Sequence, residues 1–165
     1  KKTRNRAAAK YRREYEADKK SKNDTSINFP LLRYSDILLM IAEAENVVNH
    51  GPNDLAYECI NAVRERAGIK KLAANLDEES FRKAIKDERA MELCFEYTRR
   101  FDLIRWGDYY KLMQEQVDKA QADESWKFGI NVYTYFNIPK SYNYFPIPAN
   151  EIGSNGAIKT NNPGW

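Results

Sequence analysis

Histidine, cysteine and glycine are scarce in this 165-residue sequence, which has one His, two Cys and seven Gly. Cys59 and Cys94 lie far apart without metal-ligand spacing, and two thiols do not make a disulfide framework. Each lies in an apolar helical pattern, so both are expected to be small core residues. Glycine-rich phosphate loops and the motifs of Ser or Cys nucleophiles are absent as well. These absences argue against a zinc site, a phosphate-binding loop and catalysis by a nucleophilic Ser or Cys.

Long apolar runs are also missing, and the charge is unevenly distributed. The longest apolar stretch, from Ile37 to Ala42, is too short to span a bilayer and is expected in a helix core. The net charge is only +3, yet residues 1–22 carry +7 and the remainder −4. Such a basic segment can contact nucleic acid or anionic lipid, but no nucleic-acid-binding module follows it. We expect residues 1–30 to be a solvated segment or linker that continues from upstream chain, with no nucleic-acid partner.

The domain proper is expected to occupy residues 31–165 and to start with two helices. The pattern predicts a first helix over residues 35–49 and a second over residues 53–67, the latter capped by Asn53 or Asp54. The first core stripe is expected to comprise Ile37, Leu38, Ile41, Ala44 and Val48. The second is expected to comprise Ala56, Cys59, Ile60 and Val63. The tight turn between them predicts an antiparallel hairpin like one tetratricopeptide unit, which cannot bury both of its faces alone.

Two further helices and an aromatic tail complete the predicted all-α fold. A third helix is expected over residues 78–98, entered through Asp77, and a fourth over residues 108–122. From Trp126 onward the sequence is rich in Tyr, Phe, Asn, Pro and Gly and loses its helical period. Residues 131–137 alternate enough for a short strand. The fold class is therefore expected to be all-α, with long aromatic-rich C-terminal loops and little or no β-structure.

The third helix raises a chemical question, because its carboxylates fall on its apolar face. Glu88, Glu92 and Glu96 share that face with Arg99 and with apolar positions such as Ile85. A di-metal site would need Glu-x-x-His motifs, and none exists. A hydrolase with paired carboxylates stays open as an alternative, although no motif marks one pair above another. The abundance of arginine favours a buried structural ion-pair network, composed of Glu88, Glu92, Glu96, Arg99, Arg105 and Arg64. We expect no catalytic residue, metal or cofactor.

Four segments occur together in an order typical of one family. They are LLRYSDILLMIAEAENVV (31–48), AYECINAVRERAGI (56–69), IKDERAMELCFEYTRRFDLIRWG (85–107) and YNYFPIPANEI followed by NNPGW (142–165). In this order they resemble the C-terminal region of the SusD/RagB family of Bacteroidetes outer-membrane nutrient-binding lipoproteins. Residues 10–16, KYRREYE, also resemble the segment that precedes this region. One departure is clear: the family usually has Gly in an E-G-x-R turn where this sequence has Tyr97.

The resemblance implies a fold of tetratricopeptide-like helix pairs and a non-catalytic role. Members of this family lie on the cell-surface side of the outer membrane, held by a lipid on an N-terminal Cys that this chain does not contain. They cap a SusC-like TonB-dependent transporter and pass a glycan, or in some relatives a peptide, to it. The expected partners are therefore this transporter and an oligosaccharide or other nutrient. Two alternatives remain: a helical scaffold that mainly contacts the transporter, and the carboxylate-dependent hydrolase.

No ligand-binding residue can be transferred through the family motifs, because glycan contacts in the family lie mostly in other loops. Chemistry alone indicates candidates, since aromatic faces pack against the CH surfaces of sugars while amides bond their hydroxyl groups. The candidate ligand-binding residues are Trp126, Asn131, Tyr133 and Tyr135. Trp106 and Trp165 lie inside family motifs, and we expect both to pack in the fold.

Overall fold

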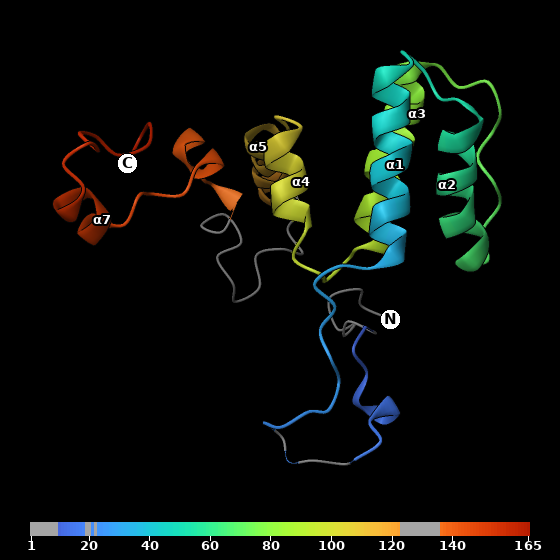
Figure 1. Ribbon diagram of the computed structural model, residues 1–165, viewed down its shortest axis with the longest axis horizontal. Helices are drawn as coiled ribbons and strands as arrows, with labels where there is room; N and C mark the ends of the chain where they lie inside the picture. Colours follow the sequence, from blue (N-terminus) through green and yellow to red (C-terminus); the bar gives the residue numbers. More distant parts are fainter. Residues whose placement is uncertain (1–9, 19–20, 22, 123–135) are drawn as a thin grey trace. The chain divides into compact units, whose positions relative to one another are not determined.

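A computed structural model describes residues 10–18, 21, 23–122 and 136–165 of the chain. The chain divides into two compact units, Lys1–Arg99 and Arg100–Trp165. The predicted division near residue 30 stays a prediction. The elements are the short 3₁₀ helices η2 (Arg13–Tyr15) and η4 (Lys140–Asn143) and the helices α1 (Tyr34–Val48), α2 (Asp54–Arg66), α3 (Glu78–Glu92), α4 (Arg99–Arg105), α5 (Tyr109–Ala122) and α7 (Ala149–Ser154) (Figure 1). The described residues contain no strand, so the all-α prediction is confirmed.

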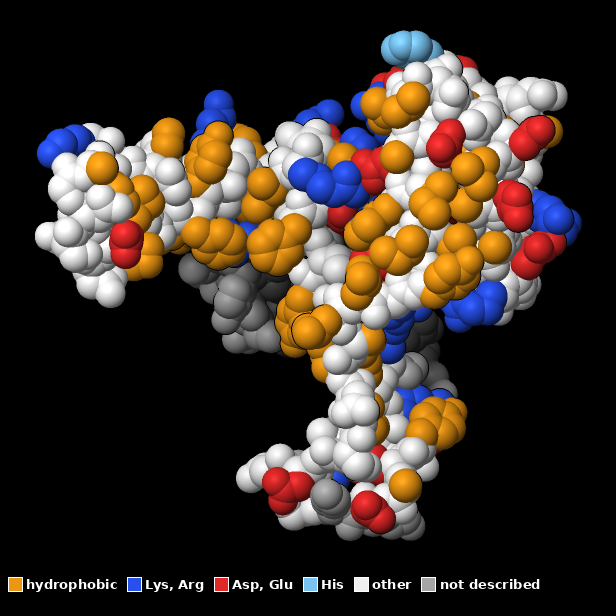
Figure 2. Space-filling model, in the orientation of Figure 1, with side chains coloured by type: hydrophobic (Ala, Val, Ile, Leu, Met, Phe, Trp, Pro, Cys, Tyr) orange, Lys and Arg blue, Asp and Glu red, His pale blue; other side chains and the backbone are white. Residues whose placement is uncertain are grey.

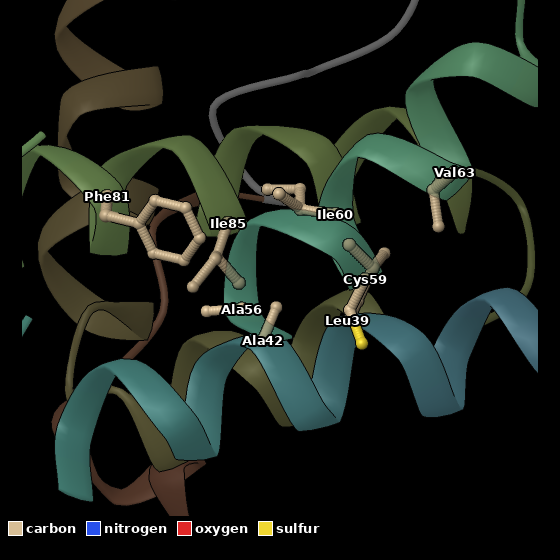
Figure 3. Packing of buried hydrophobic residues seen from close by; sticks show 8 residues of the cluster. All are labelled: Leu39, Ala42, Ala56, Cys59, Ile60, Val63, Phe81 and Ile85. Carbon is tan, nitrogen blue, oxygen red and sulfur yellow. The ribbon is translucent and has the colours of Figure 1, made fainter. Parts of the chain in front are cut away.

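Helices α1 and α2 form the predicted hairpin, and α3 packs against it (Figure 1). The Asn53 side chain caps α2 by accepting a hydrogen bond from the Ala56 N–H at 2.9 Å. Asp77 caps α3 in the same way, and the hydrogen bond from the Ser80 N–H lowers the pKa of Asp77 below its ordinary value. The core between the three helices comprises Leu39, Ala42, Ala56, Cys59, Ile60, Val63, Phe81 and Ile85 (Figure 3). The predicted stripe of α2 is thus the observed one.

The predicted core stripe of α1 was wrong at Ala44 and Val48. Leu39, Ala42 and Asn46 are buried instead, whereas Ala44 is exposed and Val48 has 76% of its surface exposed. Leu38 and Ile41 pack against the core only partly. The error has a physical cause: α1 carries two apolar stripes, one with Leu39 and Ala42 and one with Ala44 and Val48, so periodicity alone could not select the inward stripe.

The predicted third helix was too long, because α3 ends at Glu92. Phe95 and Tyr97 take left-handed backbone conformations, with φ of 63° and 61°, which break the helix before α4 begins at Arg99. Lys10, far away in sequence, donates hydrogen bonds of 2.9 Å to the carbonyls of Glu92 and Cys94. The end of α3 is therefore set by a tertiary contact, and Cys94 lies exposed beyond it and not in the core as predicted.

The second unit has its own small core, formed by Leu103, Tyr109 and Ile138. Gly107, with φ of 76°, terminates α4, and the Asp108 N–H donates to the Leu103 carbonyl at 2.8 Å. Helix α5 matches the predicted fourth helix. The predicted strand at 131–137 falls almost wholly outside the described residues. None of the described helices has both the length and the apolarity needed to cross a membrane.

Candidate functional site

Glu88, Glu92 and Glu96 each form an ion pair with a basic side chain in the first unit. Glu88 Oε2 lies 2.5 Å from Arg64 Nη1, and its side chain is only 3% exposed. Glu92 Oε1 lies 2.7 Å from Arg33 Nη1, while its other oxygen pairs with Arg66. Glu96 Oε2 lies 2.8 Å from Arg33 Nε, and its other oxygen pairs with Lys10. The carboxylates thus form ion pairs with residues of three separate segments.

Arg33 lies at the centre of this network. Its guanidinium group also donates to the Glu92 carbonyl at 2.9 Å and to the Ser35 hydroxyl at 2.5 Å. It therefore ties the residue before α1 to the end of α3. Arg33 and Lys10 together donate hydrogen bonds to the carbonyls of Glu92 and Cys94, at the point where α3 ends.

The interactions of the network keep Glu96 and Arg33 in their charged forms. Burial alone raises the pKa of Glu96, but the hydrogen bonds from Arg33 and Lys10 and their positive charges outweigh it, and the pKa falls below its ordinary value. Burial lowers the pKa of Arg33, and the two carboxylates more than reverse this. Glu96 is thus stabilised as an anion, which suits an ion pair and works against a general acid.

A further buried pair was missed by the sequence reasoning. Arg89 Nη1 lies 2.8 Å from Asp36 Oδ1, with side chains that are 3% and 7% exposed. Arg89 follows Ile85 by four residues, and Asp36 precedes Leu39 by three, so both lie on core-facing stripes. Opposite charges on the apolar faces of two helices were the signal that could have revealed this pair.

The other two arginines of the predicted network, Arg99 and Arg105, make contacts of their own. Arg99 donates to the Lys86 carbonyl at 3.1 Å. Arg105 pairs with Asp102 within α4, at 2.9 Å, in the second unit. The structure therefore brings Arg64 together with Glu88. The structural role of the whole set stays a prediction.

The predicted ligand-binding residues Trp126, Asn131, Tyr133 and Tyr135 lie outside the described residues. The tryptophans expected to pack can be placed. The ring of Trp106 is half-buried beside the second core, with the guanidinium of Arg105 4.6 Å from its centre. The ring of Trp165 stacks on Tyr142 at 5.3 Å, and its indole N–H donates to the carbonyls of Ser141 and Tyr144.

A hollow of about 340 Å³ opens in the first unit beside the ring of Tyr11. It is lined by side chains that include Asn23, Asp24 and Phe29. The polar lining is largely used to fold the segment upon itself: Arg13 donates to the carbonyls of Ser21 and Asp24, and the Ser21 hydroxyl bonds the Asp24 carboxylate. Within the part of the chain that the structure describes, no cluster of three metal-type side chains lies close enough to hold a metal ion.

Comparison with known proteins identifies the family. The model of the SusD family matches residues 2–165. The chain belongs to the SusD family. Its 146-residue match to a SusD-like protein of Formosa agariphila is 35% identical and covers 87% of this chain. The starch-binding protein SusD of Bacteroides thetaiotaomicron is 31% identical over 138 residues, or 84% of this chain. The family thus includes a carbohydrate-binding protein.

The fold of this SusD-family chain is also similar to solved structures. The crystal structure of a SusD homologue from Bacteroides thetaiotaomicron superposes with a TM-score of 0.72 at 40% identity, over 86% of this chain and 28% of that one. A SusD superfamily protein from Bacteroides vulgatus gives a TM-score of 0.63 at 29% identity, over 87% of this chain and 28% of that chain. The chain covers 25% and 21% of the two curated relatives.

Proposed function

We propose that the protein containing this chain binds a glycan at the outer-membrane surface and passes it to a SusC-like TonB-dependent transporter, without catalysis. The observation that carries the proposal is the family match across residues 2–165, together with 31% identity to a relative named as a starch-binding protein. In this proposal the protein lies on the cell-surface side and is anchored by an N-terminal lipid.

The charges of the described residues support binding over hydrolysis. The buried carboxylates are Asp36, Glu88, Glu96 and Asp102. Each of them forms an ion pair with an arginine or a lysine. A glycoside hydrolase needs one carboxyl group that keeps its proton near neutral pH. Carboxylates held by cations are instead suited to fixing the positions of helices.

The experiment that tests glycan binding is affinity electrophoresis of the full-length protein in gels that contain a panel of polysaccharides. We expect one or more polysaccharides to retard the protein, with saturable binding of the matching oligosaccharide by calorimetry. A folded protein that no glycan retards, but that still co-purifies with the transporter, would favour the scaffold alternative. Release of reducing sugar would favour the hydrolase.

The proposed ligand contacts are tested by single substitutions in the same assay. Trp126→Ala, Tyr133→Ala and Tyr135→Ala are each expected to weaken binding by about tenfold or more, because each removes a ring face. Asn131→Ala should weaken binding less, since it removes hydrogen bonds to hydroxyl groups that water can replace. Trp165→Ala is the matched control: the ring is stacked on Tyr142, so the loss should lower stability and leave the affinity of the folded protein unchanged.

A further inference from the structure

Residues 10–29, as far as the structure describes them, form a loop that we call the strap. Its two ends lie together, because the ring of Tyr11 contacts the ring of Phe29 at 5.4 Å. Among the described residues, none from the strap contributes to the hydrophobic core of α1, α2 and α3. The strap is blue in Figure 1, and its far end shows acidic side chains and few hydrophobic ones in Figure 2. It is therefore an Ω-shaped loop that lies outside the core of the helices.

Polar contacts between its own residues hold the strap in shape. The Glu16 side chain is only 2% exposed, and its carboxylate accepts hydrogen bonds from Arg13 Nε at 2.8 Å and from the Thr25 hydroxyl. Arg13 also donates to the carbonyls of Ser21 and Asp24, both at 2.9 Å. None of these bonds involves a helix of the body. The strap can therefore keep its shape when it is not in contact with the helices.

Lys10 bonds the strap to the end of α3, but it is not the sole partner of the groups that it bonds. Its ammonium group donates to the carbonyls of Glu92 and Cys94 at 2.9 Å and pairs with the Glu96 carboxylate. Arg33 bonds the same Glu92 carbonyl at 2.9 Å and the other oxygen of Glu96 at 2.8 Å. The bond to Cys94 is exposed, so water can replace it. Departure of Lys10 therefore leaves no buried charge unpaired, which keeps its cost low.

The docked strap also buries a polar group that has no partner. Among the described residues, none bonds the buried hydroxyl of Tyr11. Burial and the nearby charge of Glu96 raise the pKa of Tyr11 above its ordinary value. A buried hydroxyl without a hydrogen bond costs free energy, and contact with water removes this cost. The unpaired hydroxyl of Tyr11 therefore favours release of the strap.

We propose that the strap is a releasable arm, which detaches from the helices as one folded unit when Lys10 leaves the end of α3. Its bonds to itself keep it folded, and Arg33 keeps Glu96 paired. The ring contact of 5.4 Å between Phe29 and Tyr97 opposes release only weakly, because these residues are already 42% and 81% exposed. Release opens the end of α3 and the Glu96 carboxylate to water. This proposal does not rest on glycan binding.

The distance between two spin labels on the full-length protein tests the proposal. One label is attached at Ala17→Cys in the strap and the other at Lys83→Cys in α3, both exposed positions. Cys94 is replaced by Ser because it is exposed, whereas Cys59 is buried and stays. Electron–electron double resonance should show two distance populations, a major docked one and a minor released one. A single population in every variant would overturn the proposal.

Variants of the strap should shift these populations in opposite directions. Lys10→Met is expected to raise the ratio of released to docked protein by about tenfold or more, because it removes charge-assisted hydrogen bonds. Adding Tyr11→Phe to Lys10→Met should lower this ratio by about threefold or more, because the unpaired hydroxyl is gone. Arg12→Met is the matched control and should leave the ratio unchanged, because Arg12 pairs with Glu14 inside the strap.

Three outcomes would overturn the proposal. The first is a ratio that rises when Tyr11→Phe is added to Lys10→Met. The second is a shift for Arg12→Met as large as that for Lys10→Met. The third is a loss of helix in Lys10→Met by circular dichroism, since the strap would then not detach separately from α1, α2 and α3.

Discussion

At the scale of single residues, Glu96 shows how a buried carboxylate can be structural. It lies beyond the end of α3, is 7% exposed, and is bonded by Arg33 from before α1 and Lys10 from the N-terminal segment. Its removal leaves two cations without a shared partner. Those cations are partly exposed, so water compensates part of the loss.

Glu96→Gln is expected to lower the free energy of unfolding by about 2 kcal/mol at neutral pH. The pKa of Glu96 in the folded protein lies below its ordinary value of 4.5. The carboxylate therefore stabilises the fold fully above pH 4.5 and loses this effect as the pH falls through the folded pKa. Urea unfolding at several pH values should show that the difference in unfolding free energy between the original protein and the Glu96→Gln variant becomes smaller in acid. Glu79→Gln, at an exposed position, is the control, and its unfolding free energy should differ little from that of the original protein at any pH. A difference for Glu96→Gln that stays constant with pH would show that the Glu96 carboxylate does not stabilise the fold through its charge.

Tyr97 gives a second prediction for a single residue, because it has a left-handed backbone where the family usually has Gly. Its φ is 61°, and its ring contacts Phe29 at 5.4 Å. Tyr97→Gly removes the strain and the ring, whereas Tyr97→Ala removes only the ring. We expect the Gly variant to be about 1 kcal/mol more stable than the Ala variant by chemical denaturation. Equal stability would mean that the turn takes another conformation.

At the scale of elements, local signals predicted α1, α2, α5 and the start of α3, but they did not predict α4 or α7. Asn53 and Asp77 cap helices where expected, since a cap depends only on a few neighbouring residues. The face of α1 could not be chosen, because two apolar stripes compete and only the surroundings decide between them. The end of α3 is bonded by Arg33 and Lys10, which are separated from Glu92 by 59 and 82 residues and leave no local trace in the helix. Charge on an apolar face marked the three glutamates, and Arg64, one of the arginines predicted with them, pairs with Glu88; the structural role of the set stays a prediction.

The C-terminal loop is an element held by close packing, which yields a matched pair of predictions. A Cβ on Gly164, where φ is 86°, would lie 2.6 Å from the Cβ of Ser141, whereas a Cβ on Gly153 in α7 meets nothing within 4 Å. Gly164→Ala is expected to cost roughly 2 kcal/mol in thermal unfolding. Gly153→Ala should be neutral or stabilising by up to about 1 kcal/mol. If Gly164→Ala left the stability unchanged, the close approach of Gly164 to Ser141 would not be what holds the stack of Trp165 on Tyr142.

At the scale of the whole molecule, the charge of the basic N-terminal segment is partly used inside the protein. Residues 1–22 carry +7, against −4 for the remainder. Within the described part of that segment, Lys10 pairs with Glu96, Arg12 with Glu14 and Arg13 with Glu16. Cations that already bond carboxylates are less available to phosphates. The charge distribution therefore favours a segment that docks on its own protein over one that binds a polyanion.

This distribution predicts how binding responds to salt. Rings that stack on a neutral glycan gain nothing from long-range charge, so the affinity of the full-length protein should change less than about twofold between low and high salt. Neutralising Lys1, Lys2, Arg4 and Arg6 together to Gln should also leave that affinity unchanged. Calorimetry at several salt concentrations measures the affinity of the original protein and of this variant. Retention on immobilised nucleic acid is the control for binding to a polyanion. If the logarithm of the binding constant instead fell against the logarithm of the salt concentration, with a slope of roughly −1 for each phosphate-like contact, the ligand would be anionic and the basic segment would help to bind it.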